Sequence, residues 1–95
     1  MTLAELNEMF PNALAAIAAH CEYGSLKHNP GEPVHWAYHK STDHVRKALG
    51  HLSQAGWQDP ETERSHTINA AWRAIAALET ELVEDGAKPG PRVRF

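Results

Sequence analysis

The chain has 95 residues, a formal net charge of −3 and a single cysteine, Cys21. A chain of this size builds one hydrophobic core, and a lone cysteine excludes an internal disulfide or a zinc cluster made of cysteines. Outside the basic C-terminal tail at 86–95, the chain is acidic and lacks the clustered Lys and Arg with which a protein binds duplex nucleic acid. Broad duplex binding is therefore not expected. No segment approaches the roughly 20 apolar residues that span a bilayer, which favours a cytoplasmic protein with no membrane partner.

The N-terminal third of the chain predicts two helices. The run TLAEL fits a capping box in which Thr2 pairs with Glu5, and Pro11 ends this short helix and begins the next. Over 12–27, apolar residues recur at steps of three and four, which indicates one apolar helix face. Cys21 belongs to that face, so its thiol is expected to be buried. The following run HNPGEPVHW stops regular structure and is expected to be a loop.

Two further helices are expected in the second half of the chain. The first covers roughly 42–55 and is closed by Gly56. Asp59 followed by Pro60 predicts the cap and first turn of a last helix that runs to about residue 84. The residues expected to face the core are Val45, Ala48, Leu49 and Leu52 in the first of these helices, and Ile68, Ala71, Ile75, Leu78 and Leu82 in the second.

No alternating apolar and polar stretch is long enough to predict a strand. The expected fold class is therefore all-α: a small bundle of three to four helices over residues 1–85, followed by a Gly/Pro-rich basic tail at 86–95. Much of the hydrophobic content is alanine, which buries little area per residue. We therefore expect the bundle to be completed by homo-oligomerisation.

A polar stripe runs along the last expected helix. At about 100° per residue, His66, Asn69, Arg73 and Thr80 fall within a sector of roughly 60°, opposite Ile75. Imidazole, amide and guanidinium groups on one stripe suit an oxyanion such as phosphate. The alternative is a hydrated outer face, which in an oligomer would become a wall between subunits.

Two other regions hold candidate residues. Glu79 falls on the apolar side of its helix, where it is either a buried carboxylate with a function or a side chain that leans out near the helix end. Near the end of the second helix, Lys27 lies close to Tyr23, with Trp36 beyond the loop. Cations and aromatic rings together fit a nucleotide, because cations bind phosphate and rings stack on a base. Core packing explains the rings equally well.

Four segments follow one another along the chain: EYGSLKH, a tryptophan after a short Gly/Pro loop, ALGHL, and DPETERSHTINAAWRAIAALE. Together they resemble the phage-type dATP/dGTP diphosphohydrolase domain over roughly residues 12–82. The last segment carries the strongest resemblance. Gly50 departs from the family, which usually has an arginine there. The paired-acid motifs of MazG-like enzymes also have no counterpart in the middle of a helix.

The resemblance implies a compact helical oligomer in the neighbourhood of the MazG-like nucleotide pyrophosphohydrolases. Such an enzyme, if phage-encoded and acting in the host cytoplasm, would use Mg²⁺ or Mn²⁺ to split a nucleoside triphosphate, with purine deoxynucleotides favoured, into monophosphate and pyrophosphate. Together with the residue pattern, the resemblance marks as catalytic candidates Glu22, Glu61 and Glu79. The metal candidates are Glu22, Asp59, Glu61 and Glu79. The nucleotide-binding candidates are Tyr23, Lys27, Trp36, His51, His66, Asn69 and Arg73.

Two other functions fit the same residues. A small oligomer of this kind could sequester a nucleotide or a cyclic-nucleotide signal without cleaving it. The chain could also be a structural protein whose basic tail docks on a neighbouring subunit. Both nucleotide functions require acids and cations on separate helices to converge on one cavity.

Overall fold

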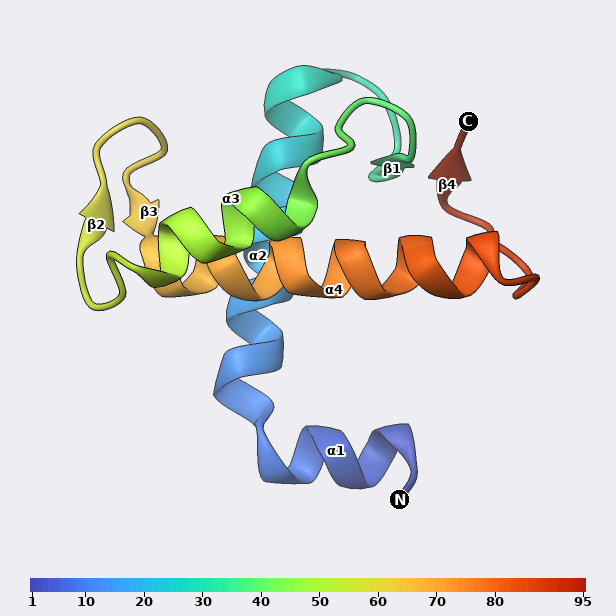
Figure 1. The fold of residues 1–95 in the computed structure, drawn as a ribbon, viewed down its shortest axis with the longest axis horizontal. Helices are drawn as coiled ribbons and strands as arrows, with labels where there is room; N and C mark the ends of the chain where they lie inside the picture. The colour runs from blue at the N-terminus through green and yellow to red at the C-terminus, as the bar shows by residue number, and fades with distance from the viewer.

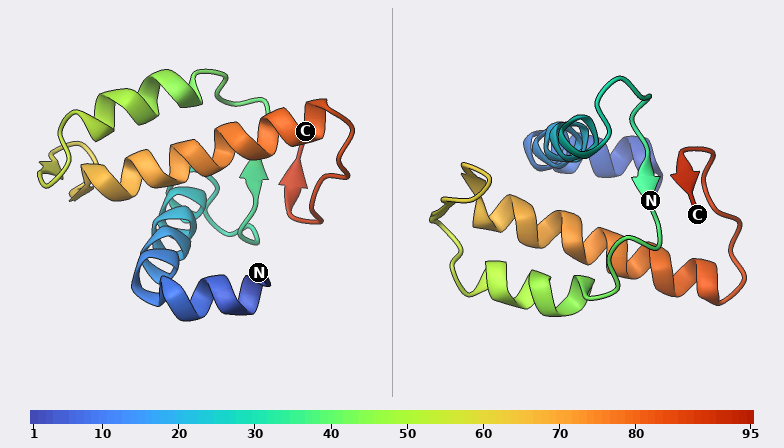
Figure 2. Two further views of the ribbon diagram at one scale, coloured as in Figure 1. Left: turned by 60° about the horizontal axis from the view of Figure 1, so that its bottom comes forward. Right: turned by 90° about the horizontal axis from the view of Figure 1, so that it is seen from above.

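The computed structural model describes all 95 residues and contains four helices, α1 (Leu3–Met9), α2 (Pro11–His28), α3 (His44–Leu52) and α4 (His66–Glu84). Helix α4 is central, with α3 packed along one side of it and α2 crossing the opposite side (Figures 1 and 2). Helix α1 turns away at the start of α2. None of the four helices has both the length and the apolar character that crossing a membrane requires.

The first two helices begin as the sequence predicts. The hydroxyl of Thr2 accepts a hydrogen bond from the Glu5 amide at 3.1 Å, and the Glu5 carboxylate accepts one from the Thr2 amide at 2.9 Å, which completes the capping box. Pro11 lies in the first turn of α2. The expectation of a buried thiol is wrong, because Cys21 is exposed. Helix α2 turns the buried His20 inward, and the next residue lies about 100° further round the helix.

The region after α3 forms a hairpin where the sequence predicted the start of a helix. Strand β2 (Gln58–Asp59) pairs antiparallel with β3 (Arg64–Ser65). The Asp59 carboxylate accepts a hydrogen bond from the Glu61 amide at 2.9 Å, and Glu63 has a φ of 58°. A carboxylate that bonds to the backbone two residues on makes a turn, so the aspartate before the proline begins a turn and not a helix.

Helix α4 is capped by Ser65 and not by Asp59. The Ser65 hydroxyl accepts hydrogen bonds from the amides of Thr67 and Ile68 at 3.1 and 3.3 Å. These are amides of the first turn of the helix, which have no partner within the helix itself. The start of α4 is therefore fixed at His66 by a serine that lies six residues after the predicted cap.

Helix α3 is shorter than predicted at both ends. Its N-cap residue, Asp43, makes no capping bond, because its carboxylate accepts hydrogen bonds from the side chains of Ser41 and Arg46. After the helix, Gly56 adopts a φ of 90° in the turn that leads into the hairpin. That backbone conformation favours glycine, since it has no Cβ to clash.

Four strands of two residues each correct the prediction that the chain has none. Besides the hairpin, β1 (Trp36–Ala37) pairs in parallel with β4 (Val93–Arg94), which brings the basic tail back onto the loop after α2 (Figure 1). Two backbone amides of the β1 segment donate to the carbonyls of Arg92 and Arg94, both at 2.9 Å. The fold nevertheless remains a small and mainly helical domain.

Helices α3 and α4 bury the side opposite to the one predicted. The buried residues are mostly polar: His20, Ser25, His44, Asp59, His66 and Asn69, beside Tyr38, Ala70 and Ala76. The large aliphatic side chains predicted to face the core are instead 47% to 64% exposed, namely Val45, Leu49, Leu52, Ile75, Leu78 and Leu82. The prediction of an aliphatic core is therefore wrong for these residues, and the polar stripe of α4 faces inward.

A row of aromatic rings fills much of the interior. The Trp36 ring lies 5.3 Å from that of Tyr38 and 6.2 Å from that of His44. The Trp72 ring lies 5.6 Å from that of His44 and 6.5 Å from that of His20. The row links the β1/β4 pair to α2 through α4. Because imidazole and indole rings carry nitrogen atoms, an interior built from them can also hold polar groups.

Candidate functional site

Three side chains meet where the end of α3, the β2/β3 hairpin and the first turn of α4 come together. The Nδ1 atoms of His51 and His66 lie 2.9 Å apart, and Nδ1 of His51 lies 3.9 Å from Oδ2 of Asp59. One ligand atom from each residue lies within 4.8 Å of the others. Atoms bound to one metal ion at about 2.1 Å are roughly 3 to 4 Å apart, so this His/Asp cluster can hold a metal ion.

Local structure fixes each member of the His/Asp cluster separately. His51 lies in the last turn of α3, and His66 is the first residue of α4, directly after the Ser65 cap. The second carboxylate oxygen of Asp59 is held by the Glu61 amide, which leaves Oδ2 on the side of His51. Hydrogen bonds of this kind orient metal-binding side chains and improve them as ligands.

Electrostatics favour the neutral form of His51. Burial lowers the pKa of His51, and the nearby charge of Asp59 only partly opposes that shift. A neutral imidazole keeps a lone pair that can bind a metal ion, whereas a protonated one does not. His51 therefore has the protonation state of a metal ligand at neutral pH. Asp59 and His66 are both buried, which removes competing water.

His20 of α2 is a further buried histidine, near enough for the charge of His51 to lower its pKa, although it was not among the predicted site residues. It is 6% exposed, and its Nδ1 atom has no hydrogen-bond partner. Burial lowers the pKa of His20, and the charges of Arg64, His51 and Arg73 add to that shift. The signal in the sequence was its spacing, three residues after Ile17 on the helix face that packs inward.

Cations and an aromatic ring lie next to the hairpin. Arg64 is the residue opposite Asp59 in the β2/β3 pair. Its guanidinium carbon lies 4.5 Å from the centre of the Tyr23 ring, and Nζ of Lys27 lies 5.8 Å from the same centre. The structure thus brings two predicted residues, Tyr23 and Lys27, together with an arginine that the sequence pattern did not single out. This combination suits a phosphate beside a planar base.

A second polar group lies further along α4. Arg73 donates hydrogen bonds to the Ser41 hydroxyl at 2.9 Å and to Nδ1 of His44 at 3.0 Å. The Trp36 ring packs against His44. Arg73 lies seven residues after His66, which is about 10 Å along a helix. The predicted nucleotide ligands Arg73 and Trp36 therefore belong to this second group and not to the His/Asp cluster.

The predicted acidic residues are not gathered at the cluster, with the exception of Asp59. Glu22 and Glu61 are exposed, and Glu79 is half buried. Glu79 follows His66 by 13 residues, about 20 Å along α4. Of the predicted polar stripe, Asn69 lies near the cluster. It is buried one turn after His66, and its side-chain amide donates to the Ser65 carbonyl at 3.2 Å. The roles predicted for the three glutamates stay predictions.

A family model described as "dATP/dGTP diphosphohydrolase, N-terminal" matches residues 2–89 of the chain. No curated protein and no solved structure gave a match. The matched range covers all four helices and the hairpin, and therefore every residue of the His/Asp cluster and of the cation-lined region around Tyr23.

Proposed function

The chain belongs to the dATP/dGTP diphosphohydrolase N-terminal family, and from this membership we propose that it hydrolyses purine deoxynucleoside triphosphates to the monophosphate and pyrophosphate. A divalent metal ion bound by His51, Asp59 and His66 would assist the reaction. The observation that carries this proposal is the cluster itself, in which a ligand atom of each residue lies within 4.8 Å of the others in a largely buried position.

The donor set of the cluster favours a transition metal ion. Two imidazole nitrogens and one carboxylate oxygen suit Mn²⁺, Fe²⁺ or Zn²⁺, whereas Mg²⁺ prefers oxygen ligands and keeps several waters. Of the two ions that the family resemblance implies, Mn²⁺ is therefore the one we propose. When bound, it would supply positive charge that neutralises phosphate oxygens in the transition state.

The side chains around the cluster would bind the substrate and accept a proton. Arg64 and Lys27 can hold phosphate oxygens, while the Tyr23 ring packs against the base. The unpartnered Nδ1 of the neutral His20 can take a proton from the attacking water. Water then adds to the α-phosphorus, the bond from that phosphorus to the bridging oxygen breaks, and pyrophosphate leaves.

Sequestration without cleavage is the second candidate function, and one observation favours it. Because Glu22, Glu61 and Glu79 lie outside the cluster, Asp59 is the single carboxylate within it. A site with one carboxylate can bind a metal–nucleotide complex without offering a carboxylate base for hydrolysis. The two candidates differ in turnover and not in binding.

The first prediction distinguishes hydrolysis from sequestration. The chain is incubated with each of the four deoxynucleoside triphosphates and either Mn²⁺ or Mg²⁺. We expect pyrophosphate release from dATP and dGTP with Mn²⁺, measured beside Mn²⁺ binding by calorimetry. Asp59→Asn should reduce both the metal affinity and the turnover by at least about 100-fold, because it removes the only anionic ligand. Its matched control is Asp85→Asn, which changes an exposed aspartate at the far end of α4.

Three results decide between the proposals. Turnover that survives in Asp59→Asn contradicts the assignment of the cluster as the catalytic site. Nucleotide binding without pyrophosphate release in the wild-type chain supports sequestration. Absence of both Mn²⁺ and nucleotide binding contradicts both functions.

A further inference from the structure

One of the three tryptophans lies outside the interior. Trp36 and Trp72 both pack against the ring of His44. Trp57, in contrast, packs against no other aromatic ring and is 75% exposed. Tryptophan is a large side chain that folded proteins bury for most of its surface, because leaving it in water costs free energy. The packing of this chain therefore does not account for Trp57.

The pairing of the hairpin places Trp57 on the same face as two members of the His/Asp cluster. Trp57 directly precedes β2, and His66 directly follows β3. The His66 amide donates to the Trp57 carbonyl at 2.9 Å, which extends the antiparallel pairing by one step and sets these two residues opposite each other. Opposite residues, and residues two apart along a strand, point to the same face. The Trp57 ring therefore lies on the side of the hairpin that carries Asp59 and His66.

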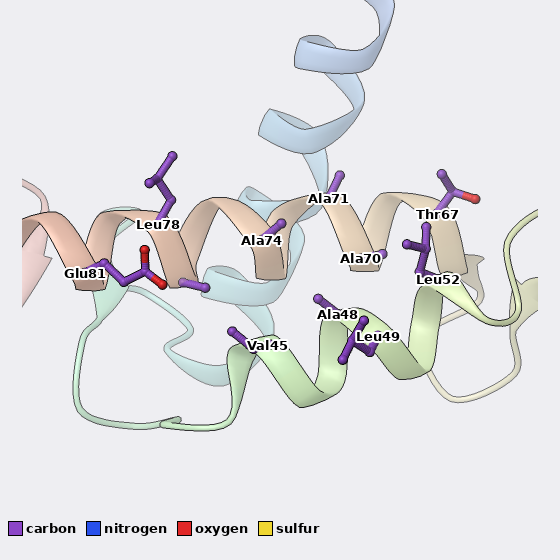
Figure 3. Close-up of a pocket in the computed structure, with 11 residues that line it drawn as sticks. Val45, Ala48, Leu49, Leu52, Thr67, Ala70, Ala71, Ala74, Leu78 and Glu81 are labelled. Atoms are coloured by element: carbon purple, nitrogen blue, oxygen red, sulfur yellow. The ribbon is translucent and has the colours of Figure 1, made fainter.

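Hydrogen bonds hold the turn before β2 in place. The Trp57 amide donates to the Gln54 carbonyl at 3.1 Å, and the Gly56 amide donates to the Thr67 hydroxyl at 3.3 Å. Thr67 of α4 and Leu52 of α3 line the same end of the groove between these helices (Figure 3). The turn is therefore tied to both helices that carry the histidines of the cluster, and the exposed ring has a rigid base.

A rigid, exposed indole ring beside a phosphate-binding site has the chemistry of a platform for a nucleobase. Stacking requires a ring face that is free, and any base can supply the other face. The proposed function gives the base one ring, that of Tyr23, and the Arg64 guanidinium carbon already lies over that ring at 4.5 Å. No cation lies over the ring of Trp57. Trp57 therefore offers the free aromatic surface that Tyr23 offers only in part.

We propose that Trp57 binds the base of the substrate by stacking and determines the preference for purines. This assignment rests on the proposed function, which places the α-phosphate at the His/Asp cluster. Trp57 and Arg64 are diagonal neighbours across the hairpin, with Asp59 and His66 at the other two corners. A nucleotide whose base lies on Trp57 has its phosphates next to the cluster and to Arg64. Because a purine has two fused rings, it covers more of the indole than a pyrimidine does.

Calorimetry with ligands that have or lack a base tests the assignment. The ligands are a dATP analogue with a methylene group between the α- and β-phosphorus, the same analogue of dCTP, and inorganic tripolyphosphate, each with Mn²⁺. Trp57→Ala should weaken binding of the dATP analogue at least about fivefold, weaken the dCTP analogue less, and leave tripolyphosphate unchanged. Trp57→Phe should restore most of the affinity. Phe10→Ala, which changes an exposed ring between α1 and α2, is the matched control and should alter none of the three.

The outcomes separate this assignment from the proposed function. An unchanged affinity of Trp57→Ala for the dATP analogue overturns the assignment and leaves the proposed function in place. An equal loss of affinity for tripolyphosphate also overturns it, because Trp57 would then act through the hairpin and not on the base. A wild-type chain that binds none of the three ligands contradicts the proposed function and the assignment together.

Acrylamide quenching of tryptophan fluorescence gives an independent measurement. Because Trp57 is exposed, acrylamide should quench its emission in the wild-type chain, and the bound dATP analogue should reduce that quenching. Tripolyphosphate should give no such protection, and in Trp57→Phe the dATP analogue should give none either. Emission that is quenched equally with and without the bound dATP analogue overturns the proposal.

Discussion

Histidine is the residue type that decides the chemistry of this interior. His20 and His44 are each 6% exposed, and each has one ring nitrogen without a hydrogen-bond partner. Buried polar atoms normally have partners, so these two free ring nitrogens are a feature that a purely structural role leaves unexplained. The neutral histidines therefore connect the packing of the interior to its capacity to bind metal and move protons.

The second prediction follows from these histidines and concerns pH. Burial lowers the pKa of His20, His44 and His51 in the folded chain. The unfolded chain thus takes up protons first, so the free energy of unfolding should be constant above about pH 7 and fall as the pH drops below the ordinary histidine pKa of about 6.5. The limit of that fall is about 1.4 kcal/mol per pH unit for each histidine. Urea unfolding between pH 8 and pH 5 measures it.

A matched pair of variants assigns this pH dependence. His44→Phe removes one buried histidine and should make the decline shallower, whereas His28→Gln changes an exposed histidine and should not. Asp43 does not contribute in this range, because hydrogen bonds from Ser41 and then Arg46 hold its pKa at about 2. Stability that stays flat down to pH 5 would contradict the neutral state of the buried histidines.

At the scale of the elements, α4 carries both the polar side chains of the interior and the aliphatic side chains of the surface. One side of the helix carries His66, Asn69 and Arg73 into the interior, and the other carries Ile75 and Leu78 outward. The helix therefore supplies a ligand of the His/Asp cluster from its first turn and exposed aliphatic side chains from its length. At its N-terminus, the Ser65 cap stabilises the helix and also holds His66 of the His/Asp cluster in place.

The third prediction concerns that cap. Ser65→Ala removes the hydroxyl that accepts hydrogen bonds from two amides of the first turn of α4. We expect a loss of about 1 kcal/mol in the free energy of unfolding, together with weaker Mn²⁺ binding, because His66 lies in the turn that frays. Ser53→Ala is the control, since that hydroxyl donates to the Gly50 carbonyl on the surface. Equal losses in both variants would contradict the role of the cap.

At the scale of the whole molecule, the ends of the chain are tied to its middle. Strand β4 pairs with β1 across almost sixty residues, and Arg92 also donates to the Val34 carbonyl at 2.9 Å. The terminal Phe95 ring lies 4.9 Å from the ring of Tyr38. The basic tail, which one hypothesis assigned to a neighbouring subunit, is therefore held by its own chain.

The fourth prediction tests this attachment. A chain that ends at Pro91 loses the carbonyls of Arg92 and Arg94, which accept from the amides of Trp36 and Tyr38. Hydrogen exchange at those two amides should rise by roughly tenfold or more, while the amides in the middle of α4 keep their protection. Unchanged exchange at both amides would show that the tail does not hold the β1 segment.

Local patterns predicted two of the local features correctly. The capping box at Thr2 and the proline at the start of α2 are interactions between residues close in the chain, and both are found. The prediction that Asp59 and Pro60 begin the last helix was wrong. An aspartate that caps a helix and one that begins a turn use the same side chain and differ only in the backbone that follows. His51, Asp59 and His66 were each predicted as site residues, but their meeting in one cluster depends on the packing of α3, the hairpin and α4.

By itself, the sequence determined the four helical segments, the two faces of α4 and the residue types able to bind a metal ion or phosphate. Which face of α4 is buried was decided only by the tertiary structure. An amphipathic pattern states that two sides of a helix differ, but in a chain this small the aliphatic side can be covered either by its own helices or by another molecule. Here the rings and histidines of α2, α3 and α4 occupy the interior, and the aliphatic side is left on the surface.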